Sequence, residues 1–263
     1  MFRVVFAELR KLRRPTLVLG TLGAALFFSA LITSFLYLLI DDPSGNGDRG
    51  RRIGREVLSL SSGSVTGFAS VGGLLGLIAL CVFAAQTAQE YTYGTLRNLL
   101  VRQSGRLRIL GGKLIANTIF ATVMVLFSAV VSIGISVALA PGAKVPTDLW
   151  FTSDGWSSIT HTVINVFIAV FGFGVIGMAL GILFRSPISS ISVGVLWILI
   201  IENLLGAVKE SALRWLPGSQ LNTIAEGGSE TISYTHAMQV GGAYVIVISV
   251  IAAVLFSRRD VAN

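Results

Sequence analysis

The run "VISVIAAVLF" at Val247–Phe256 decides the fold class, because it contains no charged residue and does not alternate between apolar and polar positions. Strands of a membrane barrel alternate in this way over about ten residues. In hydrocarbon, the other structure that pairs every backbone N–H and C=O group is the α-helix. The sequence therefore predicts an all-α membrane protein.

The composition extends this prediction to the whole chain, since 53% of its 263 residues are hydrophobic and only 13% are charged. Soluble domains carry about 25% charged residues, and a helix needs about 20 apolar residues to cross a bilayer core. The first apolar run is longer than that of a cleaved signal peptide, which has about 7–15 residues. The last apolar run, Val240–Phe256, is short for a membrane span, so we expect the helix to begin a few residues earlier, at residue 237. We expect one transmembrane domain over residues 1–263, with six spans at 17–40, 68–88, 110–140, 161–184, 188–206 and 237–256.

Basic residues are distributed unequally between the two sides that these spans define. Of the 20 Lys and Arg residues, 13 lie before span one, after spans two and four, and after span six, whereas 7 lie on the other side. Cytoplasmic segments of membrane proteins are enriched in Lys and Arg. We therefore expect a multi-pass protein of the cell membrane, such as the bacterial plasma membrane, with both termini in the cytoplasm. The net charge of +7 then reflects topology, and we expect no nucleic-acid partner.

The cysteine and histidine residues argue against several kinds of site. Cys81 is the single cysteine, so no disulfide can form within the chain. His161 and His236 lie far apart in the sequence, near the predicted outer surface. A metal site uses three or four clustered ligands, and an intramembrane serine protease uses a histidine at mid-membrane depth. We expect neither.

A glycine motif resembles a nucleotide site but lies in the wrong context. The residues "GFGVIG" at Gly172–Gly177 match GxGxxG, yet that fingerprint requires a strand before it, and here it falls within span four. Small residues instead allow membrane helices to approach closely. No GxxxxGK[ST] loop occurs either, so we expect that this chain is not an enzyme, holds no cofactor directly and does not itself hydrolyse ATP.

The N-terminal segment "MFRVVFAELRKLRRP" predicts a basic amphipathic helix over residues 1–15. Its apolar residues recur at helical spacing, while Arg3, Arg10 and Arg14 face elsewhere. Such helices lie in the membrane interface; the alternative is an ordinary basic flank of span one. The apolar residues in question are Phe2, Val5, Phe6, Leu9 and Leu12.

The stretch "QEYTYGTLRNLLVRQSGRLR" at residues 89–108 interrupts two apolar spans with a short polar segment. Within residues 92–106, three leucines share one predicted helix face, and Ser104–Gly105 is a stop signal. A short helix that offers leucines and arginines suits docking into a groove of a partner; the alternative is a basic loop that fixes topology. The side chains of this predicted helix are Leu96, Leu99, Leu100, Arg97 and Arg102.

The whole chain resembles the permeases of the ABC-2 type transporter family. The most specific part is the pattern Glu90…Gly94-Thr95-Leu96-Arg97…Ser104…Arg106…Gly112-Lys113, and "LPGSQLN" at Leu216–Asn222 is similar to the outer helical segment that precedes span six in that family. One departure is the long segment Asp41–Gly67 after span one.

The resemblance implies a membrane subunit of an ABC exporter. Two permease copies would form the pathway in the lipid bilayer, and a separate ATPase subunit, with its own ATP and Mg, would dock on the coupling segment. The implied cargo is hydrophobic or amphipathic, such as a drug, an antimicrobial peptide or a lipid. The residues implied in coupling are Glu90, Gly94, Thr95, Leu96, Arg97, Leu99, Leu100, Arg102, Arg106 and Lys113.

Polar residues within the spans are the candidates for the pathway. Glu202 is a membrane carboxylate and therefore a functional candidate, although a pair with Lys209 or Arg214 near the interface is the favoured interpretation. Asn117 and Asn165 can line a pathway or bond between helices. For Glu90, we expect an ion pair with Lys113 or with an N-terminal arginine. An ion-coupled secondary transporter and a structural membrane anchor remain the alternative functions.

Overall fold

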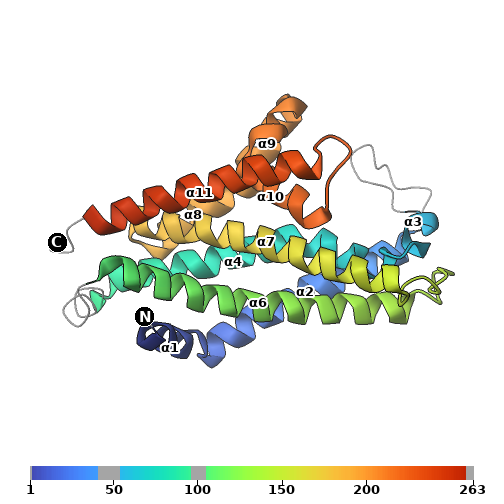
Figure 1. Cartoon of the computed structure of the whole chain (residues 1–263), viewed down its shortest axis with the longest axis horizontal. Helices are drawn as coiled ribbons and strands as arrows, with labels where there is room; N and C mark the ends of the chain where they lie inside the picture. The colour runs from blue at the N-terminus through green and yellow to red at the C-terminus, as the bar shows by residue number, and fades with distance from the viewer. Residues whose placement is uncertain (1, 41–53, 96–104, 259–263) are drawn as a thin grey trace.

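The computed structural model describes residues 2–40, 54–95 and 105–258, and every regular element among them is helical. Six helices or helix combinations are long and apolar enough to cross a membrane. Most of them run along the long axis of the molecule, whereas the end of the fifth projects away from it (Figure 1). In chain order the elements are α1 (Phe2–Leu12), α2 (Pro15–Leu38), α3 (Arg55–Ser59), α4 (Gly63–Thr92), α6 (Arg106–Leu139), α7 (Ser153–Phe184), α8 (Pro187–Leu196), η1 (Trp197–Ile201), α9 (Glu202–Val208), η2 (Glu210–Trp215), α10 (Pro217–Glu226) and α11 (Tyr234–Arg258).

The six predicted spans are confirmed as long apolar helices, but their ends differ from the prediction. The second covers Gly63–Thr92 rather than 68–88, and the fourth begins at Ser153 rather than 161. Hydropathy marks only the apolar part of a helix, whereas backbone hydrogen bonds continue into polar turns at each end. At α7 the Thr152 hydroxyl caps this polar first turn by accepting from the Gly155 N–H at 3.3 Å.

Helices α4 and α7 form the centre of the bundle, and glycines set how closely they approach. A Cβ atom added at Gly177 would lie 2.1 Å from the Leu80 carbonyl oxygen, and one at Gly76 would lie 2.1 Å from the Phe173 ring. A larger residue at Gly177 would require a helix to move, and one at Gly76 would displace the buried Phe173 ring. The glycines of the GxGxxG match therefore serve helix packing, as the sequence predicts.

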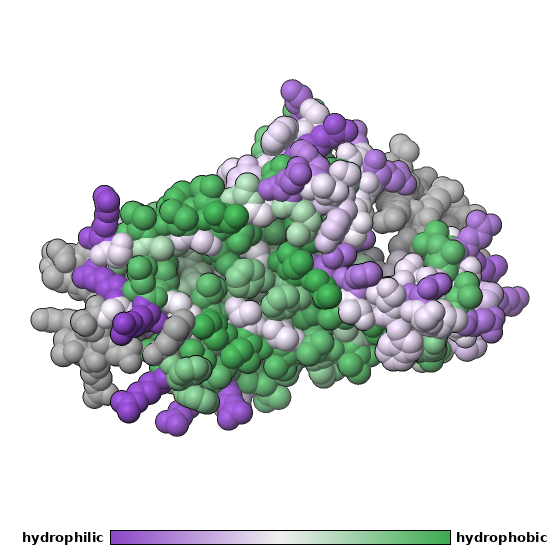
Figure 2. Space-filling model, viewed as in Figure 1, coloured by the Kyte–Doolittle hydropathy of each residue, from purple (hydrophilic) through white to green (hydrophobic). Residues whose placement is uncertain are grey.

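The surface supports insertion in a membrane. An apolar region covers the middle of the visible face, and polar residues gather toward both ends and on the projection around α9 (Figure 2). An apolar surface of this extent is unusual for a soluble monomer. Together with six candidate spans, it indicates a multi-pass membrane protein.

The two ends of the bundle carry different elements. The α1 end carries α1, the end of α4, the start of α6 and the end of α11, as Figure 1 shows. There an Nη atom of Arg106 donates to the Ser257 carbonyl oxygen at 3.1 Å, which joins the start of α6 to the end of α11. The opposite α3 end carries α3, the start of α4 and the start of α7.

The fifth span is not a uniform α-helix. It consists of α8, one π-helical turn at Trp197–Ile201, and α9. Beyond it, Lys209 leaves the helical conformation. The short helix η2 follows, and α10 then packs against α7 and α11. Pro217 occupies the first turn of α10, where its missing N–H costs no helical hydrogen bond.

Candidate functional site: a buried ring of charges at the α1 end

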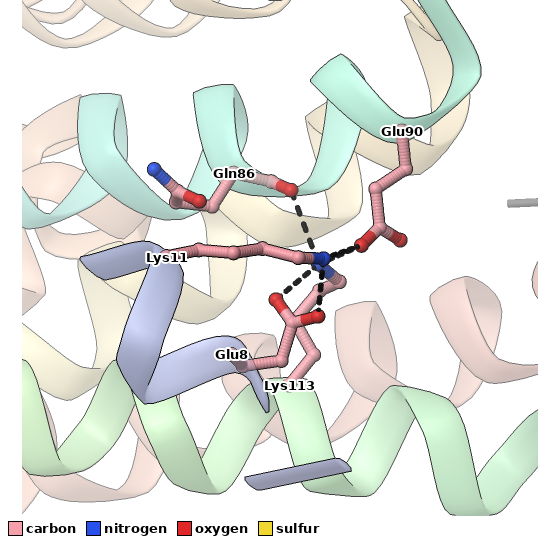
Figure 3. Close-up of polar contacts among 5 residues, drawn as sticks. All are labelled: Glu8, Lys11, Gln86, Glu90 and Lys113. Carbon is pink, nitrogen blue, oxygen red and sulfur yellow. Dashed lines mark hydrogen bonds and ion pairs between the residues drawn. The ribbon is translucent and has the colours of Figure 1, made fainter. Parts of the chain in front are cut away.

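Four charged side chains meet where α1 lies against α4 and α6. We call Glu8 and Lys11 of α1, Glu90 of α4 and Lys113 of α6 the charge ring (Figure 3). The side chains of Glu8, Glu90 and Lys113 are 3%, 7% and 4% exposed, and only Lys11, at 35%, reaches solvent. Two carboxylates and two ammonium groups give the ring no formal net charge.

The contacts alternate in sign around the ring. The Nζ atom of Lys11 lies 2.6 Å from Glu8 Oε1 and 2.7 Å from Glu90 Oε1. The Nζ atom of Lys113 lies 2.8 Å from Glu8 Oε2 and 3.0 Å from Glu90 Oε1. Each charged group therefore contacts two groups of opposite charge, and neighbours around the ring never carry the same charge.

Lys113 has three close partners, and this explains how an ammonium group can be buried here. It donates to Glu8 Oε2 at 2.8 Å and to the backbone carbonyl of Gln86 at 3.1 Å. It also forms an ion pair with Glu90 Oε1 at 3.0 Å. The carbonyl comes from the same helix as Glu90, so α4 supplies two of the three acceptors.

The position of α1 depends on close packing as well as on charge. Val4, Val5 and Leu12 are buried, and α1 contacts α6. A Cβ atom at Gly112 would lie 2.8 Å from a methyl carbon of Val4. Gly112 thus lets α1 approach α6 closely enough for Glu8 to reach Lys113.

The two ring members on α1 have shifted pKa values. Burial alone would raise the pKa of Glu8, but Lys113 and Lys11 outweigh it and hold that pKa below its ordinary value. Burial alone would lower the pKa of Lys11, but Glu90 and Glu8 outweigh it and raise that pKa. Both groups are therefore charged at neutral pH.

A second buried carboxylate, Glu202 in span five, is held in a different way. Its Oε1 atom accepts from Trp197 Nε1 at 3.0 Å and from the Gly218 N–H at 2.9 Å. Its Oε2 atom accepts from the N–H and the hydroxyl of Ser219, at 2.8 and 3.2 Å. The carboxylate lies at the N-terminus of α10, where free N–H groups and the helix dipole favour negative charge.

The predicted pairing of Glu202 with Lys209 or Arg214 is wrong. Both basic residues follow the fifth span at its end, where the chain leaves α9 and enters η2, whereas the Glu202 side chain points toward α10. The four donors around the carboxylate supply the stabilisation that a cation was expected to give.

The comparisons with known proteins place the chain in a family. A family model described as "Protein of unknown function (DUF2705)" matches residues 55–262. The chain belongs to the DUF2705 family. The matched region includes Glu90 and Lys113, whereas Glu8 and Lys11 precede it. No curated protein matches the sequence.

In this DUF2705 protein, the predicted ion pair between Glu90 and Lys113 is confirmed at 3.0 Å. The N-terminal partner of Glu90 is Lys11 and not an arginine. Sequence reasoning missed the role of Glu8 and Lys11. Their spacing of three residues on a predicted helix, beside apolar residues, was the available signal.

The remaining predicted coupling residues divide into two groups. Gly94 has a φ of 65° and ends α4, Thr95 is exposed, and Arg106 opens α6. The others lie outside the described residues; they are Leu96, Arg97, Leu99, Leu100 and Arg102.

The predicted pathway residues take part in separate local contacts. Asn165 accepts a hydrogen bond from the Tyr234 hydroxyl at 2.8 Å. Asn117 lies one turn after Lys113, is 1% exposed, and its amide nitrogen has no partner among the described residues. Glu202 is bound to α10 as described above.

The predicted apolar face of α1 divides between the surface and the bundle. Phe2 and Phe6 are 82% and 68% exposed, whereas Val5 and Leu12 are buried together with Val4. Glu8 is buried as well and faces α6, where it forms ion pairs with Lys113 and Lys11.

Proposed function

We propose that the protein is the permease subunit of an ABC-2 type ATP-binding cassette exporter, driven by a separate ATPase subunit that binds ATP and Mg. The observation that carries this proposal is the charge ring. Glu90 and Lys113 flank the segment 92–106 in sequence, and in the fold they meet each other and α1. A segment whose two ends are fastened to one buried ion network can pass a push from a docked ATPase to spans two and three.

The proposed position of α1 is the cytoplasmic membrane interface. Phe2 and Phe6 extend toward the lipid, while Arg3 and Arg10 are exposed to water and to lipid headgroups. In the proposed topology the α1 end lies in the cytoplasm and the α3 end outside, and α10 is the outer helix before span six.

The proposed assembly contains two permease copies. Span one and span five expose apolar side chains over most of their length, such as Phe27 and Phe35 on α2 and Ile200 on η1. Nothing lies within 4 Å of a Cβ atom added at Gly20 or Gly23, so α2 has room for a close helix partner. A pathway between two copies suits a hydrophobic or amphipathic cargo that enters from the bilayer.

Docking tests the coupling role directly. Burial of one leucine side chain contributes roughly 1.5–3 kcal/mol. Leu99→Ala/Leu100→Ala should therefore weaken ATPase binding by about two orders of magnitude or more, because about 1.4 kcal/mol is tenfold. Glu90→Gln should keep ATPase binding and lower transport per ATP hydrolysed. Glu56→Gln, on α3 at the opposite end, is the matched control and should change neither.

The outcomes separate the proposal from its alternatives. Normal docking and transport by the double-leucine variant would refute the coupling role. If the purified chain, without an ATPase, moves cargo on an ion gradient, it is a secondary transporter. Loss of docking in Glu90→Gln would instead place this glutamate on the contact surface.

Orientation has its own test. A cysteine at Ser219, on α10, should react with an impermeant thiol reagent added outside the cell. A cysteine at Gln103 should react only after the membrane is opened. The native Cys81 is removed first, as Cys81→Ala, so that it does not contribute. The reverse labelling pattern would place both termini outside.

A further inference from the structure

A cavity of about 300 Å³ opens at the α3 end, between α4, α7 and α10. Its walls carry two valines, four hydroxyl groups and one carboxylate, and Ser70 at its mouth is exposed. The volume lies at the lower end of the range for small-molecule sites. The side chains that the argument uses are Val57, Val65, Thr66, Ser70, Thr162 and Glu226.

Three of the four hydroxyl groups on these walls, those of Thr66, Ser70 and Thr162, have already used their protons. Thr66 donates to the Ser62 carbonyl oxygen at 3.1 Å, and Ser70 donates to the Thr66 carbonyl oxygen at 3.0 Å. Thr162 donates to the Ser158 carbonyl oxygen at 2.8 Å. A hydroxyl group has one proton and two lone pairs. Each of these hydroxyls therefore faces a ligand as an acceptor only.

A further acceptor lies one helical turn deeper. The side-chain oxygen of Asn222 is buried and has no partner among the described residues. It lies against Gly73, where an added Cβ atom would be 2.4 Å from it. Gly73 lies one turn after Ser70 on α4, and Asn222 lies one turn before Glu226 on α10. The Asn222 oxygen therefore lies between α4 and α10, about one helical turn from the cavity walls.

Glu226 adds negative charge to this set of acceptors. Glu226 already makes an interaction within the chain, so its role here is the negative charge that it brings to the rim. Acceptors and a carboxylate favour a ligand that carries N–H donors and a positive charge. A bare Ca²⁺ ion suits the site poorly, since it takes six to eight oxygen ligands and fills little of the cavity.

We propose that this cavity binds a protonated amine attached to a small apolar group. The ammonium group lies toward Ser70, Thr66 and Glu226, and the apolar group lies against Val57 and Val65. The inference concerns a ligand site, and it holds whether or not the chain is a permease.

The test uses the full chain in nanodiscs of zwitterionic lipid, with 4-fluorobenzylamine followed by fluorine NMR. Signals from empty nanodiscs are subtracted. 4-Fluorobenzyl alcohol has nearly the same shape without the charge. The amine should bind at least about tenfold more tightly, because hydrogen bonds to charged groups are the stronger ones. Equal binding of the two probes would overturn the proposal.

Three variants locate the binding. Thr66→Val keeps the shape and removes one acceptor, and Glu226→Gln removes the charge; each should weaken amine binding several-fold. Ala69→Phe fills the cavity and should abolish binding. Glu230→Gln is the control, since this exposed glutamate lies outside the cavity walls. Wild-type affinity in both Thr66→Val and Glu226→Gln would refute the site, whether or not Ala69→Phe folds.

Discussion

The charge ring and Glu202 are two solutions to the same physical problem, a carboxylate buried in an apolar protein. In the ring, Glu8 and Glu90 are stabilised by two ammonium groups. At Glu202, the donors are two backbone N–H groups, a hydroxyl and an indole N–H, all of them neutral. One site balances charge with charge, and the other disperses one charge over dipoles.

The difference determines what each site can join. Ion pairs link side chains from three helices, and so the ring fastens α1 to α4 and α6 at one point. Hydrogen bonds from backbone N–H groups require a helix N-terminus, so Glu202 fastens span five to α10 alone. The ring also depends on all its members, because loss of one charge leaves another buried and unbalanced.

The largest effect is expected for Lys113→Met. This substitution leaves Glu8 and Glu90 with Lys11 as their shared cation in the ring. Breaking a buried ion pair from one side costs about 3–5 kcal/mol, and the free energy of unfolding in detergent should fall by that amount. Lys11→Met is the matched comparison: it also leaves one carboxylate unbalanced, but Lys11 is 35% exposed and water can reach the vacated position, so its loss should be clearly smaller than that of Lys113→Met. Equal losses in both variants would show that burial does not set the strength of the ring.

The sequence predicts half of the ring, and the reason lies in α1. Glu90 and Lys113 belong to a motif and flank one segment, so their pairing follows from chain proximity. Glu8 and Lys11 are 79 or more residues away from the ring members that they contact on α4 and α6. Periodicity identifies the apolar residues of α1, but it does not show that the charged side chain of Glu8 is buried against α6.

A smaller effect is expected for Glu202→Gln. The amide has an NH₂ group in place of one carboxylate oxygen that accepts hydrogen bonds. Some of the donors on Trp197, Gly218 and Ser219 therefore lose their acceptor. An unsatisfied buried donor costs about 1–3 kcal/mol. Amide hydrogen exchange in the first turn of α10 should accelerate, while exchange in α1 stays unchanged. Glu210→Gln, on the exposed η2, is the control, and unchanged exchange in Glu202→Gln would show that the carboxylate does not hold α10.

The environment of Glu202 was not predictable from hydropathy. The run 188–206 marks a span but carries no sign of the π-helical turn at Trp197–Ile201. In a π-helical turn, residues five apart stand above one another, which brings Trp197 beside Glu202. The Gly218 partner depends on the return of the chain through η2, and a Cβ atom there would lie 2.8 Å from the Glu202 carboxylate.

The smallest effect is expected for pH, and it distinguishes a paired ring from a titrating one. A carboxyl group with a lowered pKa contributes stability above its unfolded-state pKa, and this is lost as the pH falls through the folded-state value. For Glu8 that loss lies below about pH 4.3, the ordinary value for glutamate. Lys11 has a raised pKa, so its contribution is present below its unfolded-state pKa and is lost above about pH 10.4.

Between about pH 5.5 and 9, the attachment of α1 should therefore not change. The measurement is hydrogen exchange in α1, corrected for the intrinsic pH dependence of exchange, in wild type and in Glu8→Gln. Wild type should show constant protection across this range and should lose it only in acid or above about pH 10.4, and Glu8→Gln should show weaker protection within this range. A transition near neutral pH in wild type would mean that a member of the ring changes its charge there. The ring could then not be held together by four alternating charges at neutral pH.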